Sequence, residues 1–481
     1  MRKRIAVIGG GIAGLAAAVR LRDRAPADTE IIVYEQGGAL GGKLRTGDLA
    51  GVPVERGAES FLFGAADGGE SAAVSLARRL GLGGSLVHPA ARPAALAIDG
   101  GLLPIPAGTL VGVPGDLSAL DGVALPDSDA DRDTGRPLLA PGEDVAVGEL
   151  VRSRYGDQVV DRLVDPMLGG VYAGRADRLS LRVTMPQLAR TAEIEHTLRD
   201  AVRSAQARSK RVPGRPVFAA VDGGMSRLVA AAASASAARI SLGLPVRELT
   251  RTPRGWRLTL GPVSYPPGFS APSEGPGVGN SAVPQTDDVD AVVLAVPAKP
   301  AARLLADAAP EAAQAVGALE YASVALVAMA LPPGAGLPDL SGFLVPPGEG
   351  TLVKAATFFT VKWPHLAGPD RPVIVRASLG RAGEEARLQP DDRTLFAQAH
   401  AELSRLAGVA LPEPSGFWIQ RWGGGLPQYA PGHADRVVAA RAGLPPGLAL
   451  AGAAFDGVGI PVCVASGERA ADDVCEYLEG L

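Results

Sequence analysis

The 481-residue sequence is short of cysteine, net charge, aromatic residues and long apolar runs. Its two cysteines, Cys463 and Cys475, exclude a disulfide framework and a cysteine-based zinc site, and they suit a reducing compartment. The 47 Lys and Arg residues against 51 Asp and Glu residues leave a formal charge of −4, which argues against a nucleic-acid partner. No apolar run approaches the roughly 18 residues of a membrane helix, so we expect no transmembrane segment.

Metal-binding motifs are also missing. The five histidines are scattered, without an HExxH pattern or another short ligand spacing, so we expect no metal. No pair of residues stands out as an acid–base dyad, and we assign no catalytic residue from the sequence. What is present is a globular composition, with 47% hydrophobic and 20% charged residues, over a length that suggests two to four domains.

The N-terminal segment carries the pattern of a dinucleotide-binding unit. A β-branched strand, Arg4 to Ile8, leads into a GxGxxG motif and a helix, and a second strand ends at Glu35. In such a unit Gly9 makes the tight turn, Gly11 lets a pyrophosphate approach the backbone, and Gly14 allows close helix–strand packing. Glu35 can accept hydrogen bonds from a ribose diol. The alternative, a glycine-rich structural turn, leaves Glu35 without a role.

Three further segments indicate which dinucleotide to expect. Leu40 to Thr46 places two glycines and two cations near the same pyrophosphate, and Glu55 to Phe61 reads ERGAESF. Leu448 to Gly452 predicts a strand, followed by a glycine-rich turn and an amphipathic helix from Val464 to Leu478. These segments resemble the flavin amine oxidase superfamily, in which a GG-x-x-R/S element follows the ribose acid and the other two approach the flavin. The resemblance implies bound FAD.

The glycine motif and the resemblance together assign the cofactor site. Val246 is expected to contact the adenine through its main chain, Trp422 to lie near the flavin, and the turn before the last helix to contact it through backbone groups, since Ala453 stands where many relatives have Asp. The cofactor-binding residues are Gly9, Gly10, Gly11, Ile12, Ala13, Gly14, Glu35, Gln36, Gly42, Lys43, Gly57, Ala58, Glu59, Ser60, Val246, Trp422, Val458, Gly459 and Ile460.

The fold class that follows is α/β with α+β. We expect a Rossmann-like FAD-binding domain with a two-part flavin site (1–65, 215–300 and 440–481), a mixed-sheet substrate domain (66–104 and 301–439) and a helical domain (105–214). Residues 261–290, dense in Gly, Pro and Ser, are expected to form a loop insertion between two strands. Apolar residues from Val159 to Met167 keep helical spacing until Gly169 and Gly170, where we expect the helix to end.

Three other segments carry a finer resemblance. Tyr155 to Gly174, Lys362-Trp363-Pro364 and Trp422 to His433 are similar to segments of the FAD-dependent porphyrinogen oxidases. The resemblance implies a cytoplasmic enzyme of haem biosynthesis that oxidises coproporphyrinogen III to coproporphyrin III, with hydride transfer from a meso carbon to flavin N5, oxygen as acceptor and hydrogen peroxide as by-product. Protoporphyrinogen IX as the substrate, another flavin amine oxidase or desaturase reaction, and a non-enzymatic binding protein of the same fold remain open alternatives.

The implied substrate carries four propionates, so its cavity should offer cations. The candidates are Arg92, Arg175, Arg178, Lys354 and Lys362. A basic stretch leaves peripheral membrane contact open, but a solvated face explains it better because no Trp or Phe accompanies its cations, which are Arg199, Arg203, Arg208, Lys210 and Arg211. A transient hand-over of the porphyrin to a ferrochelatase is equally left open.

Overall fold

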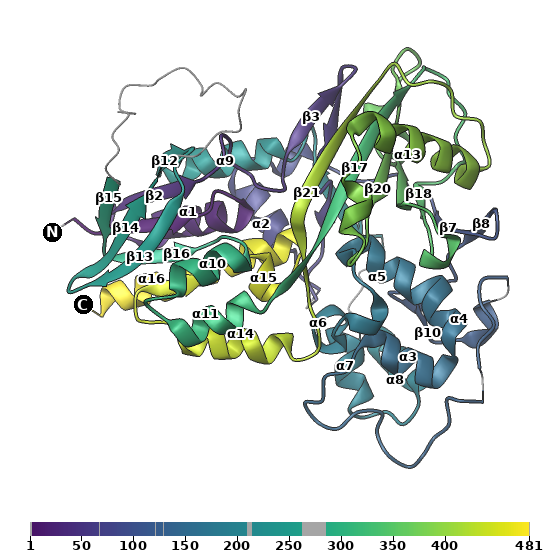
Figure 1. Cartoon of the computed structure of the whole chain (residues 1–481), viewed down its shortest axis with the longest axis horizontal. Coiled ribbons are helices and arrows are strands. Elements are labelled where there is room, and N and C mark those ends of the chain that lie inside the picture. Colours follow the sequence, from purple (N-terminus) through teal and green to yellow (C-terminus); the bar gives the residue numbers. More distant parts are fainter. Residues whose placement is uncertain are drawn as a thin grey trace.

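The computed structural model describes residues 2–66, 68–120, 122–127, 129–208, 214–261 and 285–480. One half of the molecule is built on a five-stranded parallel sheet (Figure 1). Its strands, in spatial order, are β12 (Arg239–Leu242), β2 (Glu30–Glu35), β1 (Arg4–Ile8), β16 (Ala291–Leu294) and β22 (Leu448–Leu450). The predicted strand Arg4–Ile8 is confirmed, and its residues Ile5 to Ile8 are buried because helices or a second sheet cover both faces.

Two layers cover this sheet. On one face Val7, Leu15 and Val464 share a core with the helices α1 (Ile12–Arg24), α2 (Ala72–Arg79), α9 (Ser226–Ser236) and α16 (Ile460–Glu479). On the other face Ile8 and Trp256 share a core with α10 (Ala298–Leu305), α11 (Pro310–Gly317), α14 (His433–Ala442) and a three-stranded sheet. The predicted domain boundaries placed α2 and α11 in the substrate domain, whereas both helices pack into these two cores.

The three-stranded sheet corrects part of the predicted loop insertion. It consists of β13 (Val246–Thr252), β14 (Gly255–Leu260) and β15 (Gln285–Val289), all antiparallel. The prediction of a loop up to residue 290 was wrong for β15. Its polar sequence QTDDV lacks the apolar pattern of a strand, and the strand forms because it pairs with β14. Residues 262–284 of that prediction lie outside the described residues.

The other half contains a seven-stranded mixed sheet (Figure 1). Its order is β21 (Gly416–Gln428), β17 (Glu320–Leu331), β20 (Val373–Leu379), β19 (Val353–Phe358), β18 (Gly342–Leu344), β7 (Ala94–Ile98) and β8 (Gly101–Pro104). Only the β18–β7 pair within it is parallel. The helix α13 (Asp392–Ala407) packs on one face through Leu395 and Leu403, which leaves the opposite face to meet the rest of the molecule.

Short elements connect the two halves. β3 (Thr46–Leu49) and β4 (Val52–Glu55) form a hairpin, and β11 (Phe218–Val221) pairs with β5 (Phe61–Leu62) and β6 (Leu86–Val87). α12 (Phe359–Lys362) follows β19, and α15 (Ala453–Asp456) follows β22. In the described chain these segments bring residues near 46–62 against the seven-stranded sheet, where Val54 packs with Trp363 and Trp418.

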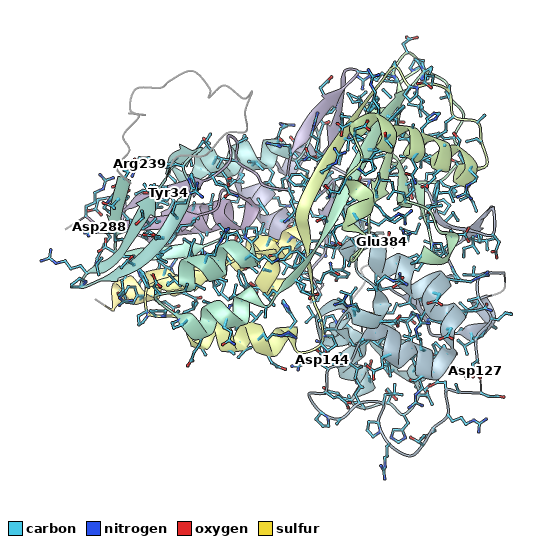
Figure 2. The ribbon with its side chains drawn as sticks, viewed as in Figure 1. Tyr34, Asp127, Asp144, Arg239, Asp288 and Glu384 are labelled. Carbon is cyan, nitrogen blue, oxygen red and sulfur yellow. The ribbon has the colours of Figure 1, made fainter. Side chains whose placement is uncertain are left out.

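A cluster of helices lies below the seven-stranded sheet in Figure 1. Its elements are α3 (Val147–Tyr155), α4 (Asp157–Val159), the π-helical turn η3 (Val160–Val164), α5 (Asp165–Tyr172), α6 (Leu181–Thr184), α7 (Pro186–Ala192) and α8 (Leu198–Ala207), with the short strands β9 (Thr109–Leu110) and β10 (Val113–Pro114) beside them. Asp144, labelled in Figure 2, accepts hydrogen bonds from Ser180 Oγ (2.7 Å) and the Gly432 amide (2.9 Å), which ties this cluster to the segment before α14.

The helix predicted to end at Gly169 and Gly170 continues to Tyr172. That prediction was wrong because packing outweighs the helix penalty of about 1 kcal/mol for each glycine. A Cβ atom on Gly170 would lie 3.0 Å from Leu344 Cδ2, so the missing side chain lets α5 approach β18 closely.

Candidate functional site

The glycine loop between β1 and α1 is tight on one side and open on the other. The Gly9 amide donates to Tyr34 O (2.8 Å), and φ at Gly9 is +110°, which favours glycine. A Cβ on Gly9 would collide with the Ala295 carbonyl, and one on Gly14 would collide with the Gly9 carbonyl. A Cβ on Gly11 would meet nothing within 4 Å. The loop therefore presents free backbone at Gly11, beside the N-terminus of α1 and its residues Ile12 and Ala13.

Glu35 is held by the backbone at the end of β2. Its two carboxylate oxygens accept hydrogen bonds from the amides of Gly10 (2.9 Å) and Gly37 (2.7 Å). Each oxygen keeps a second lone pair, so the carboxylate can still accept from a ligand hydroxyl. Gln36 beside it is exposed. The Leu244 amide donates to Glu35 O (3.1 Å), which brings the start of β13, and with it Val246, toward the same edge of the sheet.

The segment around Lys43 lies against the glycine loop. Gly41 forms a bridge with Gly11, and a Cβ on Gly42 would be 3.4 Å from the Gly11 Cα. Burial lowers the pKa of the Lys43 amine, and the thiol of Cys463 opposes this shift. Within the described residues no carboxylate contacts that amine, so a ligand anion would be its first counter-charge. A pyrophosphate at the open side of Gly11 fits this requirement.

The loop Gly57–Ser60 joins Lys43 to the seven-stranded sheet. The Ala58 amide donates to Lys43 O (3.2 Å), and Glu59 forms ion pairs with both Lys362 and Arg376. Burial opposes ionisation of Glu59, but the two cations outweigh it and lower the pKa of this carboxyl to about 2. Arg376 also donates to Glu55 O (2.9 Å) and Gly57 O (3.2 Å), so its guanidinium fixes the loop.

Arg376 was missed in the sequence. The signal that could have found it is a single cation inside the apolar strand sequence VIVRASL, because a charged side chain on a buried strand needs a partner. Trp422 on β21 approaches the same loop, where its indole Nε1 donates to Arg56 O (2.7 Å). The sheet thus contacts the loop through Trp422 and Arg376, and α12 contacts it through Lys362.

The C-terminal turn meets the start of α1. A Cβ on Gly452 would lie 3.8 Å from Ala13 Cβ, and a Cβ on Gly467 would collide with the Ala13 carbonyl. Val458 and Gly459 lead directly into α16, a 20-residue helix that begins at Ile460 without a side-chain cap. Pro461 has no N–H and the Cys463 amide donates to Gly459 O (2.9 Å), so the amides of Ile460 and Val462 are the ones that could meet a ligand in this turn. The structure therefore brings together the glycine loop, Lys43, Gly57–Ser60 and the C-terminal turn.

Cys463 lies in the first turn of α16, where its Sγ contacts Gly457 O at 3.5 Å. Burial raises the pKa of its thiol to about 11, so the group is a thiol at neutral pH and a poor nucleophile. In the described part of the chain no group of three or more His, Cys, Asp or Glu side chains could hold a metal ion. No described helix is long and apolar enough to cross a membrane.

The predicted propionate ligands have separate locations. Arg92 pairs with Asp339 (2.8 Å) and Arg178 with Glu320 (3.2 Å), in both cases near solvent. Arg175 pairs with Asp165 and Lys362 with Glu59, while Lys354 is buried without a carboxylate partner among the described residues. Of the basic stretch, Arg199 and Arg203 lie on α8, whose apolar face packs into the helical core, and Lys210 and Arg211 lie outside the described residues.

An open glycine loop at the carboxyl end of a parallel sheet, with an acid ending the neighbouring strand, defines a dinucleotide-binding protein. Comparison with known proteins assigns the chain to one family within this class. The chain belongs to the flavin containing amine oxidoreductase family, which matches residues 12–475, and it is a flavin-dependent oxidoreductase.

Three similar proteins cover the chain over almost its full length. It is 37% identical over 478 residues to the coproporphyrinogen III oxidase of Mycobacterium bovis, covering 98% of this chain and 97% of the relative. It is 28% identical to the protoporphyrinogen oxidase of Macaca fascicularis, covering 98% of both. A crystal structure of an Exiguobacterium protein matches with a TM-score of 0.81 and 29% identity, covering 100% of this chain and 99% of the other.

Proposed function

We propose that the protein is an FAD-dependent oxidase that converts coproporphyrinogen III to coproporphyrin III. The observation that carries this proposal is the full-length similarity to the Mycobacterium bovis enzyme, at 37% identity against 28% for the macaque protoporphyrinogen oxidase. The described site supports it, because the segment around Lys43 and the C-terminal turn lie against the glycine loop and the start of α1, and the loop Gly57–Ser60 is bonded to Lys43.

The cofactor roles follow from the contacts. Glu35 would hold the ribose, the Gly11 backbone and Lys43 the pyrophosphate, and the turn Val458–Ile460 the flavin ring through its amides. FAD held there would supply N5 as the acceptor of a hydride from a meso carbon, and it would pass the electrons on to oxygen. Removal of six electrons from the porphyrinogen consumes three molecules of oxygen and releases three of hydrogen peroxide.

The protein's own side chains fix the loop that would lie beside the flavin. Trp422, whose indole donates to Arg56 O, and the ion pairs of Glu59 lie where the loop Gly57–Ser60 meets the seven-stranded sheet. Arg376 holds this loop through two carbonyls and a carboxylate, so the protein's own contacts set the position of the loop before a substrate arrives. We propose the cytoplasm as its location, because Cys463 and Cys475 are both free and buried, which suits a reducing compartment.

The decisive experiment is aerobic purification followed by an absorption spectrum and a fluorescence assay with coproporphyrinogen III and protoporphyrinogen IX in parallel. We expect a yellow protein that oxidises coproporphyrinogen III with the higher kcat/KM, and peroxide equal to three times the porphyrin formed. A preference for protoporphyrinogen IX would establish the second candidate, which the macaque relative supports. A protein that oxidises neither substrate would overturn both.

A further inference from the structure

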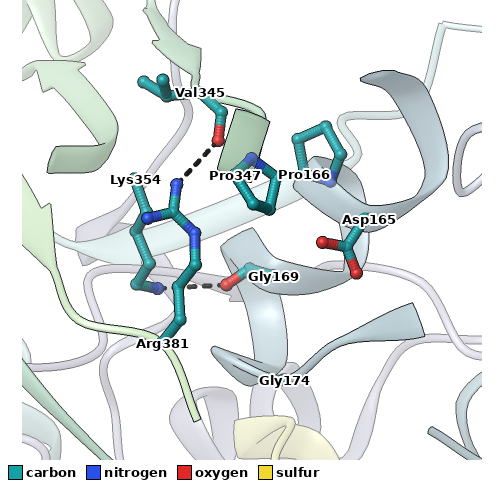
Figure 3. Close-up of a pocket in the computed structure, with 8 residues that line it drawn as sticks. All are labelled: Asp165, Pro166, Gly169, Gly174, Val345, Pro347, Lys354 and Arg381. Carbon is teal, nitrogen blue, oxygen red and sulfur yellow. Dashed lines mark hydrogen bonds between the residues drawn. The ribbon is translucent and has the colours of Figure 1, made fainter. Parts of the chain in front are cut away.

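A buried recess lies where the helical cluster meets the seven-stranded sheet (Figure 3). It is lined by Asp165, Pro166, Gly169, Gly174, Val345, Pro347, Lys354 and Arg381. Lys354 on β19 and Arg381 after β20 lie side by side on one wall, and Asp165 of α5 lies on the other. The two cations are 5% and 4% exposed, so both are removed from solvent.

The protein leaves these two cations without full compensation. Lys354 Nζ makes one hydrogen bond, to Gly169 O (3.0 Å), although an ammonium has three donors. Arg381 donates to Thr351 O (3.2 Å) and Val345 O (3.0 Å). All three acceptors are neutral carbonyls, which satisfy hydrogen bonds without cancelling charge.

The nearby carboxylates are engaged elsewhere. Asp165 accepts from the Ala176 amide (2.5 Å) and pairs with Arg175 (3.0 Å). Glu384 is 4.0 Å from Arg381 but closer, at 3.2 Å, to Arg387. Four cations therefore share two carboxylates around the recess, and the excess positive charge falls on Lys354 and Arg381. Burial, with the nearby Arg381 guanidinium, lowers the pKa of Lys354 to about 7, as expected for an ammonium group that has no carboxylate partner.

A packed cluster of side chains connects the wall of the recess to the loop Gly57–Ser60. Ala382, next to Arg381, donates from its amide to Ala173 O (2.7 Å) just after α5. Ala173 and Ala382 pack in one cluster with Trp422, whose indole bonds to the loop at Arg56. Gly169 and Gly174 add no side chains to the recess. An anionic arm of a molecule lying against Trp422 would have to pass these small residues to reach the two cations.

We propose that Lys354 and Arg381 form a carboxylate-binding subsite that takes one propionate of the porphyrinogen. This inference rests on the proposed function, which supplies a substrate with propionate arms. The carboxylate replaces the Gly169 carbonyl as the partner of Lys354 and cancels one of the two positive charges. Asp165 opposite stays bound to Arg175 and Ala176, and it orients the arm toward the cations by repulsion.

The test compares the flavin-loaded wild type with K354M, which keeps the length of the side chain and removes its charge. K299M is the matched control, because Lys299 is exposed on α10. Each protein is assayed with coproporphyrinogen III and with its tetramethyl ester in detergent, which has the same ring and no charges. Flavin content and Tm are measured alongside.

For K354M we expect the KM for coproporphyrinogen III to rise about tenfold, with kcat and flavin content retained and the KM for the ester unchanged. Its Tm should equal or exceed that of the wild type, since an uncompensated buried charge is removed. An unchanged KM, an equal rise for the ester, or a large fall in Tm would overturn the subsite. Failure of the wild type to oxidise the acid substrate would instead overturn the proposed function, and the subsite with it.

Discussion

Two acids four residues apart, Glu55 at the end of β4 and Glu59 in the loop that follows, show how strongly local contacts set charge at the residue scale. Glu59 is held ionised by Arg376 and Lys362, whereas burial raises the pKa of Glu55, four residues earlier, to about 7. Glu55 Oε1 accepts from the Met225 amide (2.7 Å) and Thr46 Oγ1 (3.0 Å), but its Oε2 has no partner. Glu55 is therefore the one of the two whose charge changes near neutral pH.

This difference predicts a pH-dependent stability. Because the folded pKa of Glu55 lies above its usual value of 4.5, its contribution is present below pH 4.5 and is lost as the pH rises through about 7. The loss is on the order of 3 kcal/mol. Glu55→Gln mimics the protonated form, so its Tm relative to the wild type should increase between pH 5 and pH 8. Parallel melting curves for the two proteins across this range would contradict the assignment.

The glycine loop gives a second prediction at this scale. Gly11→Val should fold with a Tm close to that of the flavin-free wild type, because a Cβ at this position would meet nothing within 4 Å. It should nevertheless purify without flavin, because the new side chain would occupy the space through which the pyrophosphate approaches. Gly14→Val, in the same glycine motif, should not fold, because its Cβ would collide with the Gly9 carbonyl. Absorbance at the flavin band and circular dichroism separate the two outcomes. A yellow Gly11→Val protein would remove Gly11 from the site.

At the scale of elements, strands with apolar sequences could be predicted and those formed by pairing could not. Arg4–Ile8 is recognisable because both of its faces are buried, while β15 is polar and exists through its partner β14. The glycine loop and Glu35 were visible from their spacing. The contacts of Glu59 with Lys362 and Arg376 were not, because they join residues more than 300 positions apart.

The packing of α1 on α16 carries the prediction at this scale. Gly467→Ala places a Cβ against the Ala13 carbonyl, so α16 must move away from α1. We expect a loss of about 1–3 kcal/mol in stability and a reduced flavin content, because the first turn of α16 moves with it. Gly480→Ala, at the far end of the same helix, has only ordinary contacts and serves as the control. Equal Tm and flavin content in both variants would show that the helices can separate without consequence.

At the scale of the whole molecule, the proposed flavin site is assembled from segments that lie far apart in the sequence. Gly11, Glu35, Lys43, Glu59 and the turn before α16 belong to different connections, so a ligand contacting all of them stabilises the whole fold. Removal of the flavin should lower the Tm, and added FAD should restore it in a concentration-dependent manner. At a free FAD concentration one hundred times Kd, the free energy of unfolding should rise by about 2.7 kcal/mol. ADP, which can reach only the glycine loop, Glu35 and Lys43, should restore less. Equal effects of FAD and ADP would argue that the later segments do not contact the ligand.

The order of strands in the parallel sheet also constrains how the protein is made. β1 is synthesised first, yet one of its two neighbours, β16, begins at Ala291, and the last strand of the sheet, β22, begins at Leu448. At typical rates of translation the first strand waits for roughly tens of seconds before its sheet can close. During that time its apolar faces and unpaired edge are exposed on the ribosome. Biosynthesis of this protein therefore depends on protection of the nascent chain until nearly all of it has been translated.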